Sequence, residues 1–147
     1  MAQRVMLDTN VYTDQAYRQL AQRIRGLCVS GVVVQELMVI ATREQRQALC
    51  ADFREKVKLG DGVVPGVEDW LEVGKCLGQL CSSEVNDGKL TKYEVRQLAK
   101  DALLARTAMQ KKAVLVTSNI SDFAKIKRVF RSLAFKSPSE FFGTRPR

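Results

Sequence analysis

Four acidic residues of this sequence lie where a carboxylate could carry out chemistry: Asp8, Glu36, Asp101 and Asp122. The first and the last each come after an apolar run typical of a buried strand, and the other two lie within or beside apolar stretches of helical spacing. In open parallel sheets, ligands bind in the crevice beyond the carboxyl ends of the strands. Carboxylates gathered there could hold a divalent cation or accept a proton from a nucleophile.

Each of these acids also has an ordinary structural interpretation. An Asp after a strand is commonly a helix N-cap or a turn former, which applies to Asp8. Glu36 is the only charged residue between Cys28 and Thr42. If it is buried without a partner it needs a cation, a metal or a raised pKa, whereas at a helix end it would reach solvent. Asp101 lies at the edge of the predicted core, where most Asp side chains are solvated.

Histidine is absent from the 147 residues, and this limits the chemistry that the protein can perform. Without histidine there is no Ser-His-Asp or Cys-His nucleophile, no His-ligated zinc and no His general base. The 24 Lys and Arg residues outnumber the 16 Asp and Glu residues, and the net charge of +8 favours a polyanionic partner over a merely soluble basic protein. From Lys125 onwards there are seven basic residues and one acid, Glu140.

The rest of the composition is that of an ordinary globular chain. We expect one domain over residues 1–147, with the basic segment 124–147 completing its fold. Four cysteines form no CxxC pair and are expected to be reduced and buried. They are Cys28, Cys50, Cys76 and Cys81. No apolar run approaches the ~20 residues that span a bilayer, and the N-terminus shows no signal-peptide pattern, so we expect a cytoplasmic protein without membrane contact.

Strands and helices alternate along nearly the whole chain. The apolar runs predict strands at 5–7, 27–29, 63–65, 113–117 and 133–135. Helical spacing predicts helices at 11–25, 31–41, 43–59, 68–81, 92–109 and 118–128. Residues 82–88 are expected to form the main surface loop. This alternation indicates an α/β fold with a parallel sheet and helices on both of its faces.

Two of the predicted helices begin with a capping box, opened by Thr42 and by Thr91. The inward residues of the first would be Leu49, Cys50, Phe53 and Val57. The apolar stripe of the second would be Val95, Leu98, Ala102, Ala105 and Met109, with Asp101 beside it. Ser30 is placed to cap the helix that carries Glu36.

An α/β arrangement can bring the four acids to one carboxyl edge of the sheet. Four carboxylates in one cleft repel each other unless divalent cations compensate, and oxygen ligands suit Mg²⁺ or Mn²⁺. In a basic protein without histidine, a metal held by carboxylates points to phosphodiester hydrolysis. The residues 117–119, Thr-Ser-Asn, follow a strand and can orient carboxylates or bind oxygen-rich ligands, or simply form a turn.

In this order the residues resemble the PIN-domain ribonucleases, and among them the VapC-type toxins of toxin–antitoxin operons. The matching segments are Val-Met-Leu-Asp8-Thr-Asn, Glu36 in its apolar helix, Asp101-Ala-Leu-Leu-Ala-Arg-Thr-Ala, Leu-Val-Thr117-Ser-Asn119-Ile-Ser-Asp122-Phe123 and the closing Lys-Ser-Pro-Ser-Glu-Phe-Phe. The resemblance covers almost the whole chain, although between residues 43 and 89 it is one of pattern only. Its most specific part is the ordered set of four acids with the T-x-N-x-x-D-F segment.

The resemblance implies a doubly wound parallel sheet of about five strands and an endoribonuclease activity. The acidic set for catalysis and for binding Mg²⁺ or Mn²⁺ would be Asp8, Glu36, Asp101 and Asp122. Thr117 and Asn119 would support that set, and Asn10 would help to position Asp8. The implied partners are an RNA substrate, a cognate antitoxin whose C-terminal segment occludes the cleft, and a second copy of the chain in a homodimer.

Two other functions are compatible with the sequence. The chain could be a catalytically inactive PIN-fold module that binds RNA or a partner, although such a module has no need of all four acids. It could also be an unrelated doubly wound protein that binds a small ligand, but no GxGxxG or GxxxxGK(S/T) loop is present. Lys100 and Arg106 depart from the PIN pattern, in which small residues are frequent at these positions. Either could alter metal affinity or contact RNA.

Overall fold

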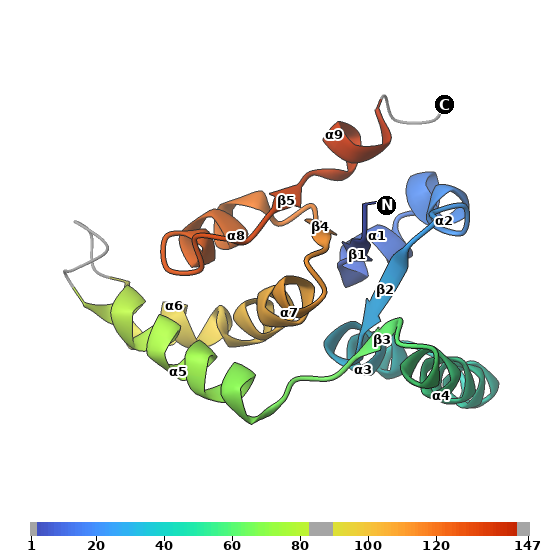
Figure 1. The fold of residues 1–147 in the computed structure, drawn as a ribbon, viewed down its shortest axis with the longest axis horizontal. Coiled ribbons are helices and arrows are strands. Elements are labelled where there is room, and N and C mark those ends of the chain that lie inside the picture. Colours follow the sequence, from blue (N-terminus) through green and yellow to red (C-terminus); the bar gives the residue numbers. More distant parts are fainter. Residues whose placement is uncertain (1–2, 83–89, 144–147) are drawn as a thin grey trace.

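A five-stranded sheet forms the centre of the computed structural model, which describes residues 3–82 and 90–143 (Figure 1). The strands are β1 (Val5–Leu7), β2 (Leu27–Ser30), β3 (Gly62–Val63), β4 (Val114–Val116) and β5 (Phe135–Lys136). They pair in the order β3-β2-β1-β4-β5, and every pairing is parallel. The predicted α/β fold, a doubly wound parallel sheet of about five strands, is therefore confirmed. From β1 the chain first adds strands on one side of the sheet, β2 and β3, and then on the other side, β4 and β5. In such sheets a crevice opens where this order reverses, here between β1 and β4.

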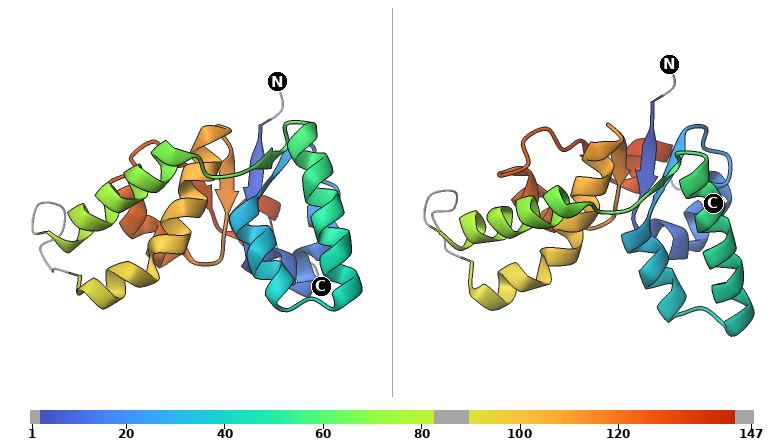
Figure 2. Two further views of the ribbon diagram at one scale, coloured as in Figure 1. Left: turned by 90° about the horizontal axis from the view of Figure 1, so that it is seen from below. Right: turned by 60° about the horizontal axis from the view of Figure 1, so that its bottom comes forward.

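Alternate residues of the short strands face two separate apolar clusters. Met6 and Leu115 pack with residues of α5 (Val67–Cys81), α7 (Ala99–Gln110) and α8 (Ile120–Lys127). Val5, Leu7 and Val116 pack with residues of α1 (Thr9–Thr13), α2 (Gln15–Ala21) and α9 (Pro138–Phe142). Helices accordingly lie on both sides of the strands, as the two views of Figure 2 show. Burial on both faces is what makes the strands continuous apolar runs in the sequence.

The single helix predicted at 11–25 is wrong, because the structure has α1 and α2 there, separated at Asp14. This residue has an extended backbone, and its carboxylate accepts the Ala16 N–H at 2.9 Å as the N-cap of α2. The N-capping preference of Asp therefore competes successfully with a continuous apolar stripe.

Helices α3 (Gly31–Val39) and α4 (Arg43–Lys58) form a hairpin at one side of the molecule (Figure 1). Both predicted starts are confirmed, since Ser30 caps α3 and Thr42 forms a capping box with Gln45. Three of the predicted inward residues of α4, Leu49, Cys50 and Phe53, are half-buried, whereas Val57 is exposed. In the described part of the chain none of the α4 residues is fully buried. The physical reason is that α4 packs on α3 and on the edge strand β3, so its apolar side is only half covered.

The predicted helix at 68–81 corresponds to α5, whereas the one predicted at 92–109 is divided at Leu98 into α6 (Lys92–Gln97) and α7. The capping box of Thr91 is confirmed, and the predicted stripe from Val95 through Leu98 to Ala105 is buried. Most of the predicted loop, residues 83–88, lies outside the described residues.

The C-terminal part contains one helix that the sequence patterns do not predict. The predicted edge strand at 133–135 is displaced to β5, and Leu133 is instead a buried turn residue. α9 follows, capped by Ser137, and its Phe142 stacks on Tyr17 with ring centroids 5.2 Å apart. Residues 144–147 of the predicted basic segment 124–147 lie outside the described residues.

All four cysteines are free thiols. The predicted burial is confirmed for Cys28 and Cys76, while Cys50 and Cys81 are half-buried. In the described part of the chain, every helix is too short or too polar to cross a membrane.

One buried acid of the fold lies away from the carboxyl edge of the sheet and holds α5 to α7. Asp69 is only 4% exposed; it accepts the Arg106 Nε–H at 3.1 Å, the Gly66 N–H at 2.8 Å and a hydrogen bond from Gln110. The Arg106 guanidinium also lies over the Phe130 ring, 5.7 Å from its centroid. The suggestion that Arg106 contacts RNA or the metal set is therefore not supported, since its partners are structural.

We predict that Asp69→Ala lowers the free energy of unfolding by about 3–5 kcal/mol, because it leaves the half-buried Arg106 charge unpaired and removes two further hydrogen bonds. Urea unfolding followed by circular dichroism would measure this loss. Glu72→Ala is the matched control, because it breaks an exposed ion pair with Lys75 on the same helix and should cost no more than about 1 kcal/mol. Equal losses in the two variants would contradict the assignment of Asp69.

Candidate active site

An acidic cleft of about 460 Å³ opens at the carboxyl edge of the sheet, where the strand order reverses. All four acids singled out in the sequence line it, together with Lys100 and with the two asparagines that the sequence also singled out. These residues are Asp8, Asn10, Glu36, Lys100, Asp101, Asn119 and Asp122. They come from the turn after β1, from α3 and α7, and from the turn and helix after β4. The structure thus brings together residues that are up to 114 positions apart in the chain.

Asp8 is the most deeply placed of these acids, at 5% exposure. Its Oδ1 accepts the Thr9 N–H at 2.7 Å, so Asp8 is indeed the N-cap of α1. Its Oδ2 faces the other side and accepts the Thr117 hydroxyl at 2.8 Å and the Asn10 amide at 3.1 Å. Burial nevertheless raises the pKa of Asp8, and the hydrogen bonds from Thr117 and Thr9 oppose the rise. The N-cap interpretation of Asp8 is therefore confirmed, and the residue also lines the cleft.

Thr117 and Asn10 join the ends of β1 and β4. The Thr117 side chain is fully buried, and its oxygen also accepts the Asn119 N–H at 3.0 Å. The Asn10 side chain bridges the gap, because its amide nitrogen donates to Asp8 and its oxygen accepts the Ser118 N–H at 3.1 Å. Both residues fix the position of the Asp8 carboxylate.

Asn119 links the two acids on the opposite side of the cleft. Its Nδ2 donates to Asp101 Oδ2 at 3.0 Å and to Asp122 Oδ2 at 2.9 Å. Burial is the main cause that raises the pKa of Asp101 to about 6, and the negative charge of Asp8 adds to it. Lys125 lies 3.7 Å from the outer oxygen of Asp122. Asp101 thus titrates close to neutral pH in this environment.

Glu36 has a cation as its partner, which is one of the alternatives that the sequence leaves open for this residue. Its side chain is 25% exposed, and its Oε2 accepts a hydrogen bond from Lys100 Nζ at 2.9 Å. The same hydrogen bond raises the pKa of Lys100. The second oxygen, Oε1, is buried and has no hydrogen-bond partner among the described residues.

The carboxylate oxygens of the cleft are chemically suited to bind a hard divalent cation. Mg²⁺ and Mn²⁺ prefer carboxylate oxygens, and the orphaned Glu36 Oε1 is an oxygen of the right kind. In the described residues, however, no three acidic or cysteine side chains are grouped closely enough to hold an ion as they stand. Amide, hydroxyl and ammonium groups already occupy most of the carboxylate oxygens. Binding would therefore require these side chains to turn away from their present donors.

Sequence reasoning missed three polar residues that also line the cleft: Thr9, Thr13 and Gln97. A signal for Gln97 was available, because in the continuous helix predicted at 92–109 it precedes Asp101 by four residues and so shares its face. Thr9 and Thr13 are likewise four residues apart on α1.

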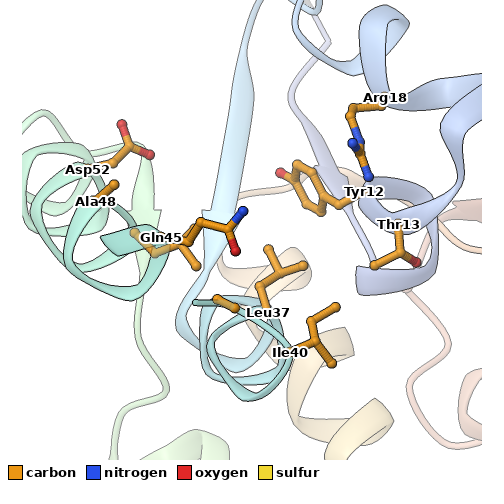
Figure 3. Close-up of a pocket in the computed structure, with 10 residues that line it drawn as sticks. Tyr12, Thr13, Arg18, Leu37, Ile40, Gln45, Ala48 and Asp52 are labelled. Carbon is orange, nitrogen blue, oxygen red and sulfur yellow. The ribbon is translucent and has the colours of Figure 1, made fainter. Parts of the chain in front are cut away.

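A second cavity, a groove of about 540 Å³, lies between the helices after β1 and the α3–α4 hairpin (Figure 3). Its labelled side chains are Tyr12, Thr13 and Arg18 on one side, Leu37 and Ile40 from the α3 region, and Gln45, Ala48 and Asp52 from α4. The Tyr12 hydroxyl is buried without a hydrogen-bond partner in the described part of the chain, and burial raises its pKa. Thr13 lines both the groove and the acidic cleft, so the two cavities adjoin.

Three solved structures share this fold. The structure of FitAB bound to an IR36 DNA fragment aligns with a TM-score of 0.55 at 15% identity, covering 91% of this chain and 94% of that one. VapBC2 from Rickettsia felis, bound to a DNA fragment from its promoter, gives 0.50 at 21% identity, covering 90% and 97%. VapBC-1 from nontypeable Haemophilus influenzae gives 0.51 at 17% identity, covering 90% and 96%.

No family model matches the sequence, and no curated protein matches it. At these identities the structural matches establish the fold. The chain has a PIN-like α/β fold, consistent with the resemblance to VapC-type PIN domains that its sequence shows.

The raised pKa of Asp101 gives the metal-free protein a defined pH dependence. The folded state binds this proton more tightly than the unfolded chain, so the contribution of Asp101 to stability falls as the pH rises from about 3.8 to about 6. We predict that Asp101→Asn removes this loss and raises the free energy of unfolding at pH 7 by about 1–2 kcal/mol, after allowance for solvent exposure.

Urea unfolding in EDTA between pH 4 and pH 7.5 would test this. Asp52→Asn, which changes an exposed acid of α4, is the control and should keep the wild-type pH profile. An Asp101→Asn profile parallel to that of the wild type would rule the effect out.

Proposed function

We propose that this chain is a metal-dependent endoribonuclease and the toxin of a type II toxin–antitoxin pair. The observation that carries the proposal is the convergence of four carboxylates at the crevice of a doubly wound sheet, in a protein of net charge +8 that lacks histidine. The fold shared with FitAB and VapBC proteins supports the toxin role. The PIN pattern of the sequence supports the nuclease activity.

The residues of the cleft would have distinct roles. Asp8, Glu36, Asp101 and Asp122 would hold Mg²⁺ or Mn²⁺, which supplies an activated water and stabilises the charge on the phosphate and the leaving oxygen. Thr117 and Asn10 position Asp8 by donating hydrogen bonds to it. Asn119 positions Asp101 and Asp122 by donating a hydrogen bond to each. One of these carboxylates would act as the general base that accepts the proton of the attacking water.

The substrate proposed is RNA, bound through its phosphates. Lysine and arginine contacts to phosphates position a nucleic acid and carry no sequence information by themselves. Basic side chains lie beside the cleft, among them Lys125 next to Asp122.

The proposed assembly is a homodimer with an antitoxin bound to each chain. On α5, Val67, Trp70 and Leu71 are exposed and share one face by their spacing, which is the composition of a subunit interface. The antitoxin segment would lie in the groove of Figure 3, whose apolar floor includes Leu37 and the 69% exposed Ile40. Because Thr13 borders both cavities, a segment in the groove reaches the rim of the acidic cleft.

We predict that the purified protein cleaves a mixed pool of structured RNAs with Mg²⁺ or Mn²⁺ and not with EDTA. Asp8→Asn should reduce the rate by at least about 100-fold, because it weakens both the metal set and its alignment. Glu72→Gln, outside the cleft, is the control and should cleave at the wild-type rate. Equal RNA binding by wild type and Asp8→Asn, without cleavage by either, would favour the inactive PIN-fold module instead.

We predict further that Ala48→Glu weakens binding of the proposed antitoxin by at least about tenfold, because it places a charge against an apolar contact. Co-expression and pull-down, followed by titration of the purified partners, would measure it. Ala51→Glu is a matched control, since Ala51 is exposed on the same helix and does not line the groove. If both variants bind the partner as the wild type does, the groove is not its docking site.

A further inference from the structure

Lys100 is the one cationic side chain among the described residues that line the acidic cleft. Its ammonium donates to Glu36 Oε2 at 2.9 Å and so joins α7 to α3, across 64 positions of sequence. The lysine side chain is 55% exposed, whereas the Glu36 side chain is 25% exposed. An exposed ion pair contributes little to stability, so its position within a group of acids is the more informative feature.

The carboxylates of the cleft are satisfied by two kinds of donor. Neutral groups serve three of them: Asp8 receives hydrogen bonds from Thr117 and Asn10, and Asn119 serves Asp101 and Asp122. Asp122 also has the Lys125 ammonium 3.7 Å from its other oxygen, but Lys125 does not line the cleft. Among the four acids, Glu36 is the one paired with a cation that does line it.

The charge of Lys100 acts on more than its direct partner. It lowers the pKa values of both Asp8 and Asp101, against the effect of burial, and those two acids in turn help to keep Lys100 protonated. The ammonium therefore compensates the repulsion between carboxylates that a divalent cation would otherwise have to compensate.

We propose that Lys100 is an internal counter-ion that competes with a divalent cation for Glu36, so that metal binding and the Lys100–Glu36 ion pair exclude each other. The inference rests on the proposed function, in which the cleft binds Mg²⁺ or Mn²⁺. Both cations bind the same carboxylate, Glu36, and the two charges repel each other inside a cleft of about 460 Å³. Lys100 thereby sets the metal concentration at which the site fills.

The test is Mn²⁺ and Mg²⁺ binding by the full chain, measured by isothermal titration calorimetry without RNA. Lys100→Gln keeps a polar side chain, one bond shorter, and removes the charge, so it should bind Mn²⁺ about fivefold or more tightly than the wild type. Lys100→Arg retains the charge and should bind within twofold of the wild type. Lys75→Gln removes a lysine from an exposed pair with Glu72 on α5, outside the cleft, and should also bind within twofold. Unchanged or weaker Mn²⁺ binding by Lys100→Gln would overturn the proposal.

A second measurement needs no variant. In the wild type, the side-chain ammonium signal of Lys100 in nuclear magnetic resonance spectra should shift when Mg²⁺ is added to saturation, while that of Lys75 stays unchanged. An unshifted Lys100 signal at saturating Mg²⁺ would overturn the competition even if Lys100→Gln does not fold.

The outcomes separate this inference from the proposed function. If neither metal binds to the wild type at millimolar concentration, the proposed function fails and the competition fails with it. If the wild type binds Mn²⁺, Asp8→Asn loses that binding, and Lys100→Gln binds no more tightly, then only the role of Lys100 is refuted.

Discussion

The carboxylate of Asp8 is accepted in the interior only because hydrogen-bond donors from two distant parts of the chain converge on it. An unsatisfied charge at that depth would be far too costly. The donors Thr9 and Asn10 are close to Asp8 in the sequence, but Thr117 directly follows β4, more than a hundred residues later. The parallel pairing of β1 with β4 is what brings Thr117 there, with Leu7 in register with Val116. The sheet, the crevice and the acidic cleft therefore depend on a single shared set of hydrogen bonds.

Much of this architecture follows from short sequence patterns, because buried parallel strands are written as continuous apolar runs. Strands β1, β2 and β4 and the capped starts of α3, α4 and α6 lie where the patterns indicate. Patterns failed where two local preferences compete, as at Asp14, whose capping divides a helix that the apolar spacing makes continuous. For α4 they indicated the inward side but not its incomplete burial, because apolar periodicity does not show how much protein lies there to cover a helix.

The candidate site was predictable as a set of residues and much less so as a geometry. The position after a predicted strand identified Asp8 and Asp122. Helical spacing placed Glu36 on an apolar helix face and Asp101 beside one. The hydrogen bond of Lys100 to Glu36 depends on the packing of α7 against α3, which no local pattern encodes. The partners of Arg106 were hidden for the same reason, since Asp69 lies on a different helix.

The central position of β1, with one neighbour close in sequence and the other far away, also orders the events of synthesis. Asp8 and Asp122 are separated by 114 positions, so at ~5–20 residues per second a ribosome needs about 6–23 s to pass from one to the other. During that interval β1 can pair with β2, but β4 and the turn that carries Asn119 do not yet exist. The growing chain therefore carries its helical groove well before it carries a complete acidic cleft. A partner that recognises the groove could engage the nascent protein before its chemistry is assembled.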